Sequence, residues 1–314
     1  MRAVRCLHKQ VHVVDVPPPS GDGVLIKIAG AGICGSDLHL VDGPYELGVT
    51  LGHEMAGWLP DGRPVAIEPL APCGHCEFCH DGAYNLCKRG PGMVMGVGME
   101  GGMAEQIRVP ERAIVPLASG IPVGDACLIE PLAVAYHGLR LADLRAGEQV
   151  LVVGAGAIGL CAAGIAVALG ARVTVKARHD HQRRAAELLG ARLEEQQRGD
   201  YALVIDAAGT TAALDEAVER CKPGGRILML GSYWEPLAIN GQGICMKELR
   251  LIPAAMYSRD KDQRDIDRAA ALLAQHPRLA AAIITHRLPL DAAAEAFAIA
   301  RNRASGAIKV VLEP

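Results

Sequence analysis

Residues that commonly bind metals gather in one short stretch of this sequence. The run CGSDLH fills positions 34–39, and GHE follows at positions 52–54. A thiolate, an imidazole and a carboxylate are ligand types that zinc prefers in proteins. The stretch therefore predicts a catalytic zinc site, with a buried free cysteine and a satisfied core histidine as the alternative.

Four further cysteines crowd into a second stretch. The run Cys73-Gly-His-Cys76-Glu-Phe-Cys79 is followed by Cys87 after seven more residues. Two-residue spacers let successive sulfurs point at one centre, and the longer loop brings the fourth sulfur round to complete a tetrahedron with no open position. The cluster predicts a structural zinc site. An iron–sulfur cluster and disulfide pairs are the alternatives, which metal analysis separates.

A glycine-rich motif lies between an apolar strand and an Ala-rich helix. QVLVV at 149–153 precedes GAGAIG at 154–159, which fits GxGxxG, and a helix at 160–169 leads to a second strand at 172–175. This order is typical of a dinucleotide site with the pyrophosphate over the helix N-terminus; a turn used only for packing is the alternative. The motif residues expected at the cofactor are Gly154, Gly156, Ala157, Ile158 and Gly159.

The end of the second strand favours NADP over NAD. An NAD site places Asp or Glu about twenty residues after the motif, on the ribose hydroxyls. Here the run KARH fills positions 176–179, and Asp180 comes later, where it is expected to cap the next helix. The missing acid and the basic side chains of Lys176, Arg178 and Arg183 suit a 2′-phosphate. Basic residues that only solvate a surface turn are the alternative.

The elements that must position these groups are of two kinds. Up to about residue 130 the chain reads as short strands punctuated by Gly and Pro, with a helical turn at 34–39. From 149 to about 257 strands and helices alternate, as in a parallel sheet. The sequence predicts strands at 11–16, 24–29, 65–67, 201–206, 226–230, 281–284 and 307–312, and helices at 211–221, 266–275 and 291–301.

Two local features leave alternatives open. The Met-rich stretch at 90–102 could line a substrate pocket, although apolar core or a loop is the favoured interpretation. Glu130 stands inside the otherwise apolar segment 127–132. An unpaired buried carboxylate is costly, so Glu130 either faces a cation or is exposed at a helix start before Pro131.

Composition narrows the class of protein. The 314 residues suffice for two domains, and no apolar run approaches the ~20 residues of a membrane span. With 32 basic and 35 acidic residues and no Lys/Arg run, nucleic acid is not an expected partner. The first residues lack the pattern of a secretory signal, so we expect a cytoplasmic protein whose thiols stay reduced.

Together these motifs make the chain resemble the zinc-dependent medium-chain dehydrogenase/reductases. Within them it is most similar to the polyol (sorbitol), butanediol and threonine dehydrogenase branch. The resemblance implies a GroES-like, β-rich catalytic domain and a Rossmann domain with a doubly wound parallel sheet, an α/β protein with its active site in the cleft between the domains. The motifs that carry it are 34–39, 52–54, the four clustered cysteines, Glu130-Pro131-Leu132, 154–159 and Ile284-Thr285-His286.

The resemblance also implies the division of the chain. The catalytic domain would comprise 1–132 and 259–314, with a structural-zinc lobe near 73–87, and the Rossmann domain would comprise 133–258. The segment between Glu54 and Cys73 is shorter than in typical members, so a hairpin there is expected to be trimmed. A homodimer or homotetramer is implied as well.

Family roles carry over to the matching metal-binding positions. Cys34 and His53 would bind the catalytic zinc, and Glu54 or Glu130 would be the third ligand, directly or through water. At the strand end, Ala177-Arg178 resembles NADP-using members of the polyol branch, whereas Arg183 does not align cleanly.

The resemblance gives a proton path too. Ser36 would pass the proton of the substrate hydroxyl toward the cofactor ribose and His39. Asp37 would orient the zinc-binding histidine from behind.

The sequence thus predicts a zinc-dependent NAD(P)(H) alcohol dehydrogenase or ketone reductase with two zinc ions per chain. It would interconvert a secondary alcohol or polyol and its carbonyl by hydride transfer, since zinc polarises the substrate oxygen and nicotinamide carries the hydride. A zinc-independent quinone or enone reductase would need no catalytic ligands. A redox-sensing dinucleotide-binding protein with a four-cysteine switch would leave Cys34, Ser36 and His39 unexplained.

Overall fold

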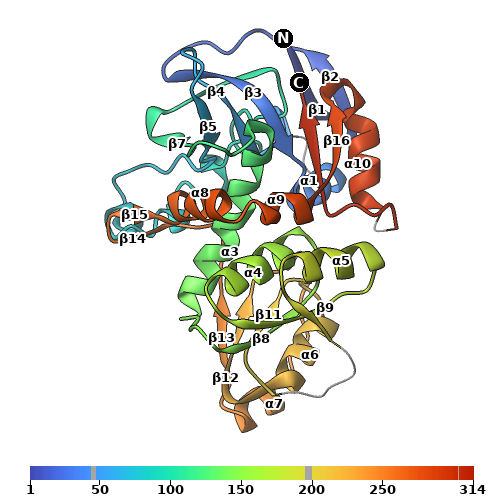
Figure 1. The fold of residues 1–314 in the computed structure, drawn as a ribbon. Helices are drawn as coiled ribbons and strands as arrows, with labels where there is room; N and C mark the ends of the chain where they lie inside the picture. Colours follow the sequence, from blue (N-terminus) through green and yellow to red (C-terminus); the bar gives the residue numbers. More distant parts are fainter. Residues whose placement is uncertain (44–46, 195–199, 303) are drawn as a thin grey trace. The chain divides into compact units, whose positions relative to one another are not determined.

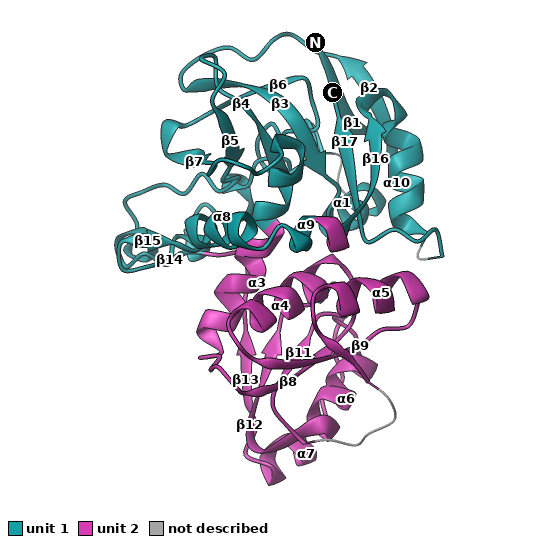
Figure 2. Ribbon diagram, viewed as in Figure 1, with its two compact units in different colours: residues 1–130, 258–280, 284–314 teal, residues 131–257, 281–283 magenta. Residues whose placement is uncertain are grey.

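The chain forms two compact units in the computed structural model, which describes residues 1–43, 47–194, 200–302 and 304–314 (Figure 2). Unit 1 contains residues 1–130, 258–280 and 284–314, and unit 2 contains residues 131–257 and 281–283. The chain therefore leaves unit 1 after Glu130 and returns to it at Ser258. Among the described residues, no helix is long and apolar enough to cross a membrane.

Unit 1 is built on β-strands that come from both ends of the chain (Figure 1). Its strands are β1 (Arg2–Leu7), β2 (Gln10–Asp15), β3 (Val24–Gly32), β4 (Glu54–Trp58), β5 (Pro64–Ile67), β6 (Gln106–Val109), β7 (Ile114–Pro116), β14 (Arg259–Asp260), β15 (Gln263–Arg264), β16 (Ile284–Pro289) and β17 (Lys309–Glu313). Its helices are α1 (Gly35–Asp42), α2 (Glu77–His80), α8 (Asp265–Gln275) and α10 (Ala293–Arg301), with 3-10 turns η1 (Tyr84–Leu86), η2 (Gly90–Met93), η3 (Glu111–Ala113), η4 (Val123–Leu128) and η5 (Leu290–Ala292).

Strand β3 is the centre of this unit. The main sheet has the order β16-β17-β3-β4-β5-β7, and β6 pairs with the first half of β3. The neighbours pair antiparallel except β16 and β17, which are parallel. Ile26 and Ile28 of β3 lie in one apolar core, whereas Ala31, farther along the same strand, lies in another with Val310 and Phe297 of the C-terminal segment. The last segment of the chain is thus part of the sheet that begins near residue 24.

The Met-rich stretch belongs to the core. Met93, Met95 and Met103 are buried, and Met99 packs against the cluster that contains Met95. Flexible thioether side chains fill irregular gaps well. This agrees with the favoured interpretation of the stretch. The hairpin between β4 and β5 closes in a short turn, in which the Leu59 and Arg63 backbones are hydrogen-bonded.

One sequence prediction in this part of the chain is wrong. The strand expected at 281–284 is instead the end of helix α9 (Arg278–Ile283), and strand β16 begins at Ile284. The run RLAAAI is rich in alanine and leucine, which have the highest intrinsic helix propensities. Ile283 is the single β-branched residue of this run, which is too little to make it a strand.

Unit 2 is a six-stranded parallel sheet in the order β10-β9-β8-β11-β12-β13. This is a doubly wound order, in which the chain begins in the middle and builds outward in both directions. The elements are α3 (Ile129–Leu141, which begins in unit 1), β8 (Gln149–Val153), α4 (Ala157–Ala168), β9 (Arg172–Lys176), α5 (Asp180–Leu188), β10 (Arg192–Leu193), β11 (Tyr201–Asp206), α6 (Thr211–Arg220), β12 (Cys221–Met229), α7 (Gly241–Met246) and β13 (Arg250–Pro253).

The direction of winding sets which helices cover which face of this sheet. Right-handed crossovers place α4 and α5 on one face and α6 and α7 on the other, as Figure 1 shows for unit 2. The central strands β8 and β11 are therefore covered on both sides and are almost entirely buried. This explains their continuous apolar sequences.

Candidate functional site

Pairing between β3 and β4 brings the first two predicted metal ligands together. Gly32 of β3 is opposite Glu54 of β4 in the antiparallel register. Cys34 follows β3 and His53 precedes β4, so the two side chains meet at the same end of the strand pair. A Cβ atom at Gly32 would lie 2.2 Å from Oε2 of Glu54, so only glycine leaves room for this carboxylate.

Helix α1 fixes the orientation of the cysteine. Cys34 is the N-cap residue of α1, and its backbone N–H donates to Oδ2 of Asp37 at 2.9 Å. Local capping thus fixes the backbone at Cys34 where β3 ends and α1 begins.

Ser36 and Asp37 contact opposite sides of the histidine ring. Nε2 of His53 lies 3.3 Å from Oγ of Ser36, and Nδ1 lies 3.5 Å from Oδ1 of Asp37. Burial disfavours protonation of His53, but the charges of Asp37 and Cys34 outweigh it and raise the His53 pKa well above its usual range. Burial also raises the pKa of Asp37. The ring is thus held in a strongly negative environment.

Glu54 forms a buried ion pair with a lysine from the other end of the chain. Its Oε1 lies 2.6 Å from Nζ of Lys309, which also donates to the Ile33 carbonyl at 2.9 Å. The side chains are only 1% and 2% exposed. Oε2 of Glu54 is buried and has no hydrogen-bond partner among the described residues. The sequence interpretation missed Lys309, although a lysine inside the apolar run IKVVL was a signal.

The donor atoms of three residues fit a metal ion. One atom each from Cys34, His53 and Glu54 lies within 4.8 Å of the others. Thiolate, imidazole and carboxylate are all zinc ligands, and a cation here would neutralise the negative surroundings of His53 and satisfy the orphaned Glu54 oxygen. The arrangement fits a zinc ion with a position open to substrate.

Glu130 lies outside that tight group but near it. It is buried in the first turn of α3, and burial raises its pKa to about 7, while the charge of His53 acts in the opposite direction. Of the two readings of Glu130, the structure thus excludes the exposed one. Of the two candidate third ligands, it is Glu54 that groups with Cys34 and His53.

Ser36 and His39 lie on one side of helix α1. They are three residues apart, which puts them on the same helix face. Ser36 is half-buried beside the histidine ring, and His39 is exposed. Ser36 thus lies beside the metal-binding group, and His39 lies at the solvent-exposed end of the same helix face.

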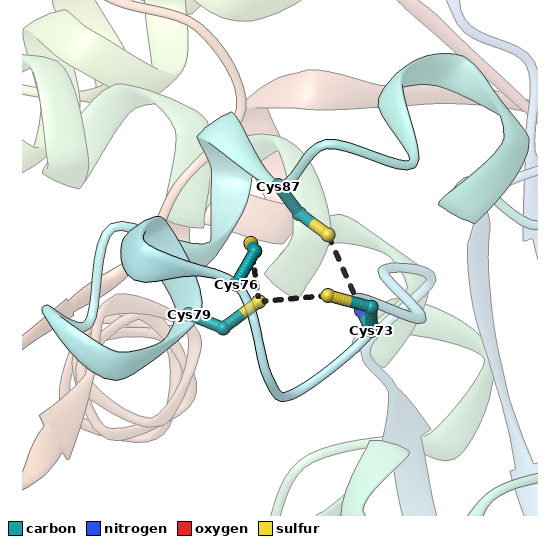
Figure 3. A group of neighbouring side chains, drawn as sticks. All are labelled: Cys73, Cys76, Cys79 and Cys87. Carbon is teal, nitrogen blue, oxygen red and sulfur yellow. Dashed lines mark hydrogen bonds between the residues drawn. The ribbon is translucent and has the colours of Figure 1, made fainter.

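The four clustered cysteines surround a common point (Figure 3). Sγ of Cys79 lies 3.9 Å from Sγ of Cys73 and 3.5 Å from Sγ of Cys76, and the Cys73 N–H donates to Sγ of Cys87. Sulfurs placed tetrahedrally at ~2.3 Å from zinc are roughly 3.8 Å apart, whereas a disulfide needs ~2.05 Å. Distances and donor types fit one tetrahedral ion, and all four are free thiols.

A buried hydrogen-bond network ties this cysteine lobe to the rest of unit 1. The Tyr84 hydroxyl, from between Cys79 and Cys87, donates to Oε1 of Glu68 at 2.6 Å and to the Ser258 carbonyl at 3.1 Å. Arg264 donates to Oε2 of the same carboxylate at 3.0 Å. Burial raises the pKa of Glu68, although the Tyr84 hydroxyl and the charge of Arg264 act in the opposite direction. Sequence reasoning missed this network, since its members are far apart in the chain.

In unit 2, the glycine motif makes the turn expected of a phosphate-binding loop. Gly154 has φ of +102°, and a Cβ at Gly159 would lie 1.9 Å from the Gly154 carbonyl oxygen, so both positions require glycine. Gly156 is the N-cap residue of α4, and a Cβ there would meet nothing within 4 Å. Ala157 and Ile158 follow in the first turn of α4. This open helix N-terminus suits a pyrophosphate.

The basic residues at the end of β9 differ in their contacts. Nζ of Lys176 lies 2.5 Å from Oε1 of Glu216 on α6, and Arg183 donates to the Ala177 carbonyl at 3.3 Å. Arg178 is exposed, and no hydrogen bond or ion pair links it to another described residue. Only this one of the three cations is without a protein partner in the part of the chain that the structure describes.

Asp180 does not cap helix α5, contrary to the sequence prediction. The N-cap residue is His179, whose backbone is extended, and Gln182 completes a capping box with it. Asp180 is the first residue of the helix, where its negative charge interacts favourably with the helix dipole. Strand β9 itself has no carboxylate at its end.

Comparisons with known proteins agree with this architecture. Residues 20–119 match the family model of the alcohol dehydrogenase GroES-like domain, and residues 157–275 match that of the zinc-binding dehydrogenases. L-galactonate-5-dehydrogenase of Escherichia coli is 35% identical over 310 residues, which cover 90% of this chain and 89% of that protein.

Solved structures give the same result. Galactitol-1-phosphate dehydrogenase from Escherichia coli has a TM-score of 0.89 at 30% identity, with full coverage of both chains. A zinc-binding dehydrogenase from Sinorhizobium meliloti bound to NADP has a TM-score of 0.86 at 28% identity, covering 100% of this chain and 99% of that one. The chain therefore belongs to the zinc-dependent medium-chain alcohol dehydrogenase family, in its polyol branch, and is an oxidoreductase.

Proposed function

We propose that the protein is an NADP-preferring dehydrogenase that interconverts a secondary hydroxyl of an open-chain sugar acid or sugar alcohol and its ketone. The observation that carries the proposal is the group of half-buried Cys34 with buried His53 and Glu54, whose ligand atoms lie within 4.8 Å of one another beside Ser36. The names of two relatives, L-galactonate-5-dehydrogenase and galactitol 1-phosphate 5-dehydrogenase, support this substrate class.

The chain's own residues would hold and orient the metal. Cys34, His53 and Glu54 would bind the catalytic zinc, and Glu130, which interacts electrostatically with His53, would replace Glu54 as the third ligand or supplement it through water. Asp37 fixes the ring of His53 from behind, as partners of metal-bound histidines do. Zinc, when bound, lowers the pKa of a substrate hydroxyl and polarises a carbonyl.

Ser36 and His39 would move the proton of the substrate hydroxyl. Ser36 accepts it beside the zinc ligands and passes it along the face of α1 to the exposed His39, which releases it to solvent. The hydroxyl and imidazole have the right types for this relay, because both can donate and accept.

The cofactor would bind to unit 2 through its phosphates. The backbone from Gly154 to Gly159 receives the pyrophosphate, with Ala157 and Ile158 in the same helix turn. Ala177 leaves room at the ribose, and Arg178 with Arg183 would bind the 2′-phosphate. The exposed guanidinium of Arg178, which has no partner among the described residues, is the feature that supports NADP over NAD.

We further propose a second, structural zinc and a dimeric or tetrameric assembly. Cys73, Cys76, Cys79 and Cys87 would bind the structural ion, which gives two zinc ions per chain. The proposed compartment is the reducing cytoplasm, because clustered thiols that hold a metal must stay reduced. The proposed assembly is based on the family resemblance alone.

A pair of cysteine variants tests the catalytic site. Cys34→Ala should abolish turnover and lower the zinc content from two ions per chain to one, with NADPH binding unchanged. Cys6→Ala, which removes a buried thiol of the same unit, is the control and should keep both zinc and activity. Full activity of Cys34→Ala would overturn the proposal.

A panel of substrates and cofactors tests the proposed substrate class and the preference for NADP. Sugar acids, phosphorylated sugar alcohols, free sugar alcohols and cyclic secondary alcohols would each be measured with NADP and NAD. A higher kcat/KM with NAD would refute the cofactor preference. Arg178→Ala should lower kcat/KM for NADP, whereas the neighbouring exposed Arg184→Ala should not.

Neither alternative from the sequence is favoured by these observations. A zinc-independent quinone or enone reductase does not account for the grouped donors of Cys34, His53 and Glu54. A redox-sensing switch would use the four-cysteine lobe but leave the same group and Ser36 without a role. Turnover of a polyol that depends on Cys34 would separate both from the proposal.

A further inference from the structure

The ion pair between Lys176 and Glu216 joins two elements that are distant in sequence. Lys176 is the last residue of β9, and Glu216 comes from α6, which follows a strand two places away in the sheet. Their side chains are 49% and 21% exposed, and the charged atoms are 2.5 Å apart. Both line a surface hollow of about 1160 Å³ that also includes Asp215 and Glu219 of the same helix.

The place of this pair matters because the end of the second strand contacts the adenosine ribose in a dinucleotide fold. A carboxylate there binds the ribose hydroxyls of NAD, and a cation there accepts the 2′-phosphate of NADP. β9 supplies no carboxylate, but Glu216 of α6 places one against Nζ of Lys176, the last residue of β9. The carboxylate near the end of this strand therefore comes from another element.

We propose that Glu216 is a cofactor-specificity residue that limits the preference for NADP. It neutralises Lys176, so that a 2′-phosphate meets the free charge of Arg178 but not the full charge of Lys176. Its own negative charge also repels a phosphate near the end of β9. This inference rests on the proposed function, since it concerns how the same cofactor site chooses its ligand.

The expected effect follows from the exposure of the pair. Water screens charges at this depth, so removing one carboxylate should change binding only modestly. Glu216→Gln should tighten binding of a 2′-phosphate about five-fold, which corresponds to ~1 kcal/mol at ~1.4 kcal/mol per tenfold change. The effect should shrink at high salt, because screening weakens exposed charge interactions.

Binding of two fragments by the full-length protein tests the proposal without a substrate. The probes are 2′,5′-ADP and 5′-AMP, which differ only in the 2′-phosphate, measured by calorimetry. In Glu216→Gln the ratio of their affinities should shift about five-fold toward 2′,5′-ADP, with 5′-AMP affinity unchanged. Glu219→Gln, on the same helix and the same hollow, is the matched control and should leave the ratio as in the wild type.

The outcomes separate this inference from the proposed function. Tighter binding of 5′-AMP than of 2′,5′-ADP by the wild type would refute the NADP preference alone. An unchanged ratio in Glu216→Gln, or an equal shift in Glu219→Gln, would refute the role of Glu216. The ratio of kcat/KM for NADP over NAD should shift in the same direction and by the same factor.

Discussion

Replacing Lys309 with methionine removes the positive partner of Glu54 while keeping most of the side-chain volume. The lysine and the carboxylate are nearly inaccessible to water, and the other Glu54 oxygen already lacks a hydrogen-bond partner among the described residues. The variant would therefore leave a buried negative charge without its cation. We expect Lys309→Met to destabilise unit 1 strongly.

The magnitude follows from the burial of this pair. Removing one partner of a buried ion pair costs about 3 to 5 kcal/mol, because the remaining charge has lost its solvation and its partner. For a unit of this size, each kcal/mol lowers Tm by roughly 2 to 4 °C, so Tm should fall by about 6 to 20 °C. The double variant Glu54→Gln, Lys309→Met removes both charges and should be more stable than Lys309→Met alone.

The two tryptophans allow unit 1 to be observed by itself. Trp58 lies in β4, the strand that begins with Glu54, and Trp234 lies in unit 2. In a Trp234→Phe background, urea unfolding followed by fluorescence reports on unit 1. A chelator in all samples removes the metal that would also bind Glu54.

Two results would refute the reasoning. One is a Lys309→Met variant as stable as the wild type, and the other is a double variant no more stable than the single one. The control is Lys27→Met, since Lys27 is an exposed lysine on β3 of the same unit. It should change the unfolding free energy by less than about 0.5 kcal/mol.

Three further predictions concern the cysteine lobe and the hydrogen-bond network of Tyr84 and Glu68 that ties it to unit 1. Cys76→Ser should lower the zinc content from two ions per chain to one while leaving the site at Cys34 loaded; unchanged zinc by elemental analysis would contradict the tetrahedral site. Tyr84→Phe should cost about 1 to 3 kcal/mol of unit 1 stability in the urea assay, because it removes a hydrogen bond to a buried carboxylate, and a cost near zero would contradict this. Burial raises the pKa of Glu68 above its ordinary 4.5, so the folded state binds more protons there and the unfolding free energy should fall as pH rises above that value. Glu68→Gln should remove that slope, and a slope kept in full would show that other groups cause it.

The motifs of this chain could be recognised from sequence because their residues are close together along it. The four cysteines lie between positions 73 and 87, and the glycine motif follows its strand directly. Their geometry is set by local turns and helix starts, which short sequence patterns encode. Alternation of apolar strands and helices likewise indicated the parallel sheet of unit 2.

Sequence patterns predicted secondary structure less well in short segments. The alanine-rich run at 278–283 ends in Ile283, and Ile284 follows it, so the strand predicted at 281–284 overlaps the helix α9. Short apolar runs carry little periodicity, so helix and strand are hard to separate there. His179 replaces Asp180 as the helix cap for a similar reason, since the start of α5 depends on backbone geometry within one residue.

The sequence by itself determined the donor types, the cofactor fold and the absence of an acid at the end of β9. Only the tertiary structure decided which carboxylate joins Cys34 and His53, because that depends on the register of β3 against β4. It alone also revealed the partners of the charged groups, Lys309 beside Glu54 and Glu216 beside Lys176. These pairs join residues 255 and 40 positions apart, and no local pattern encodes a contact that arises only when distant strands and helices pack together.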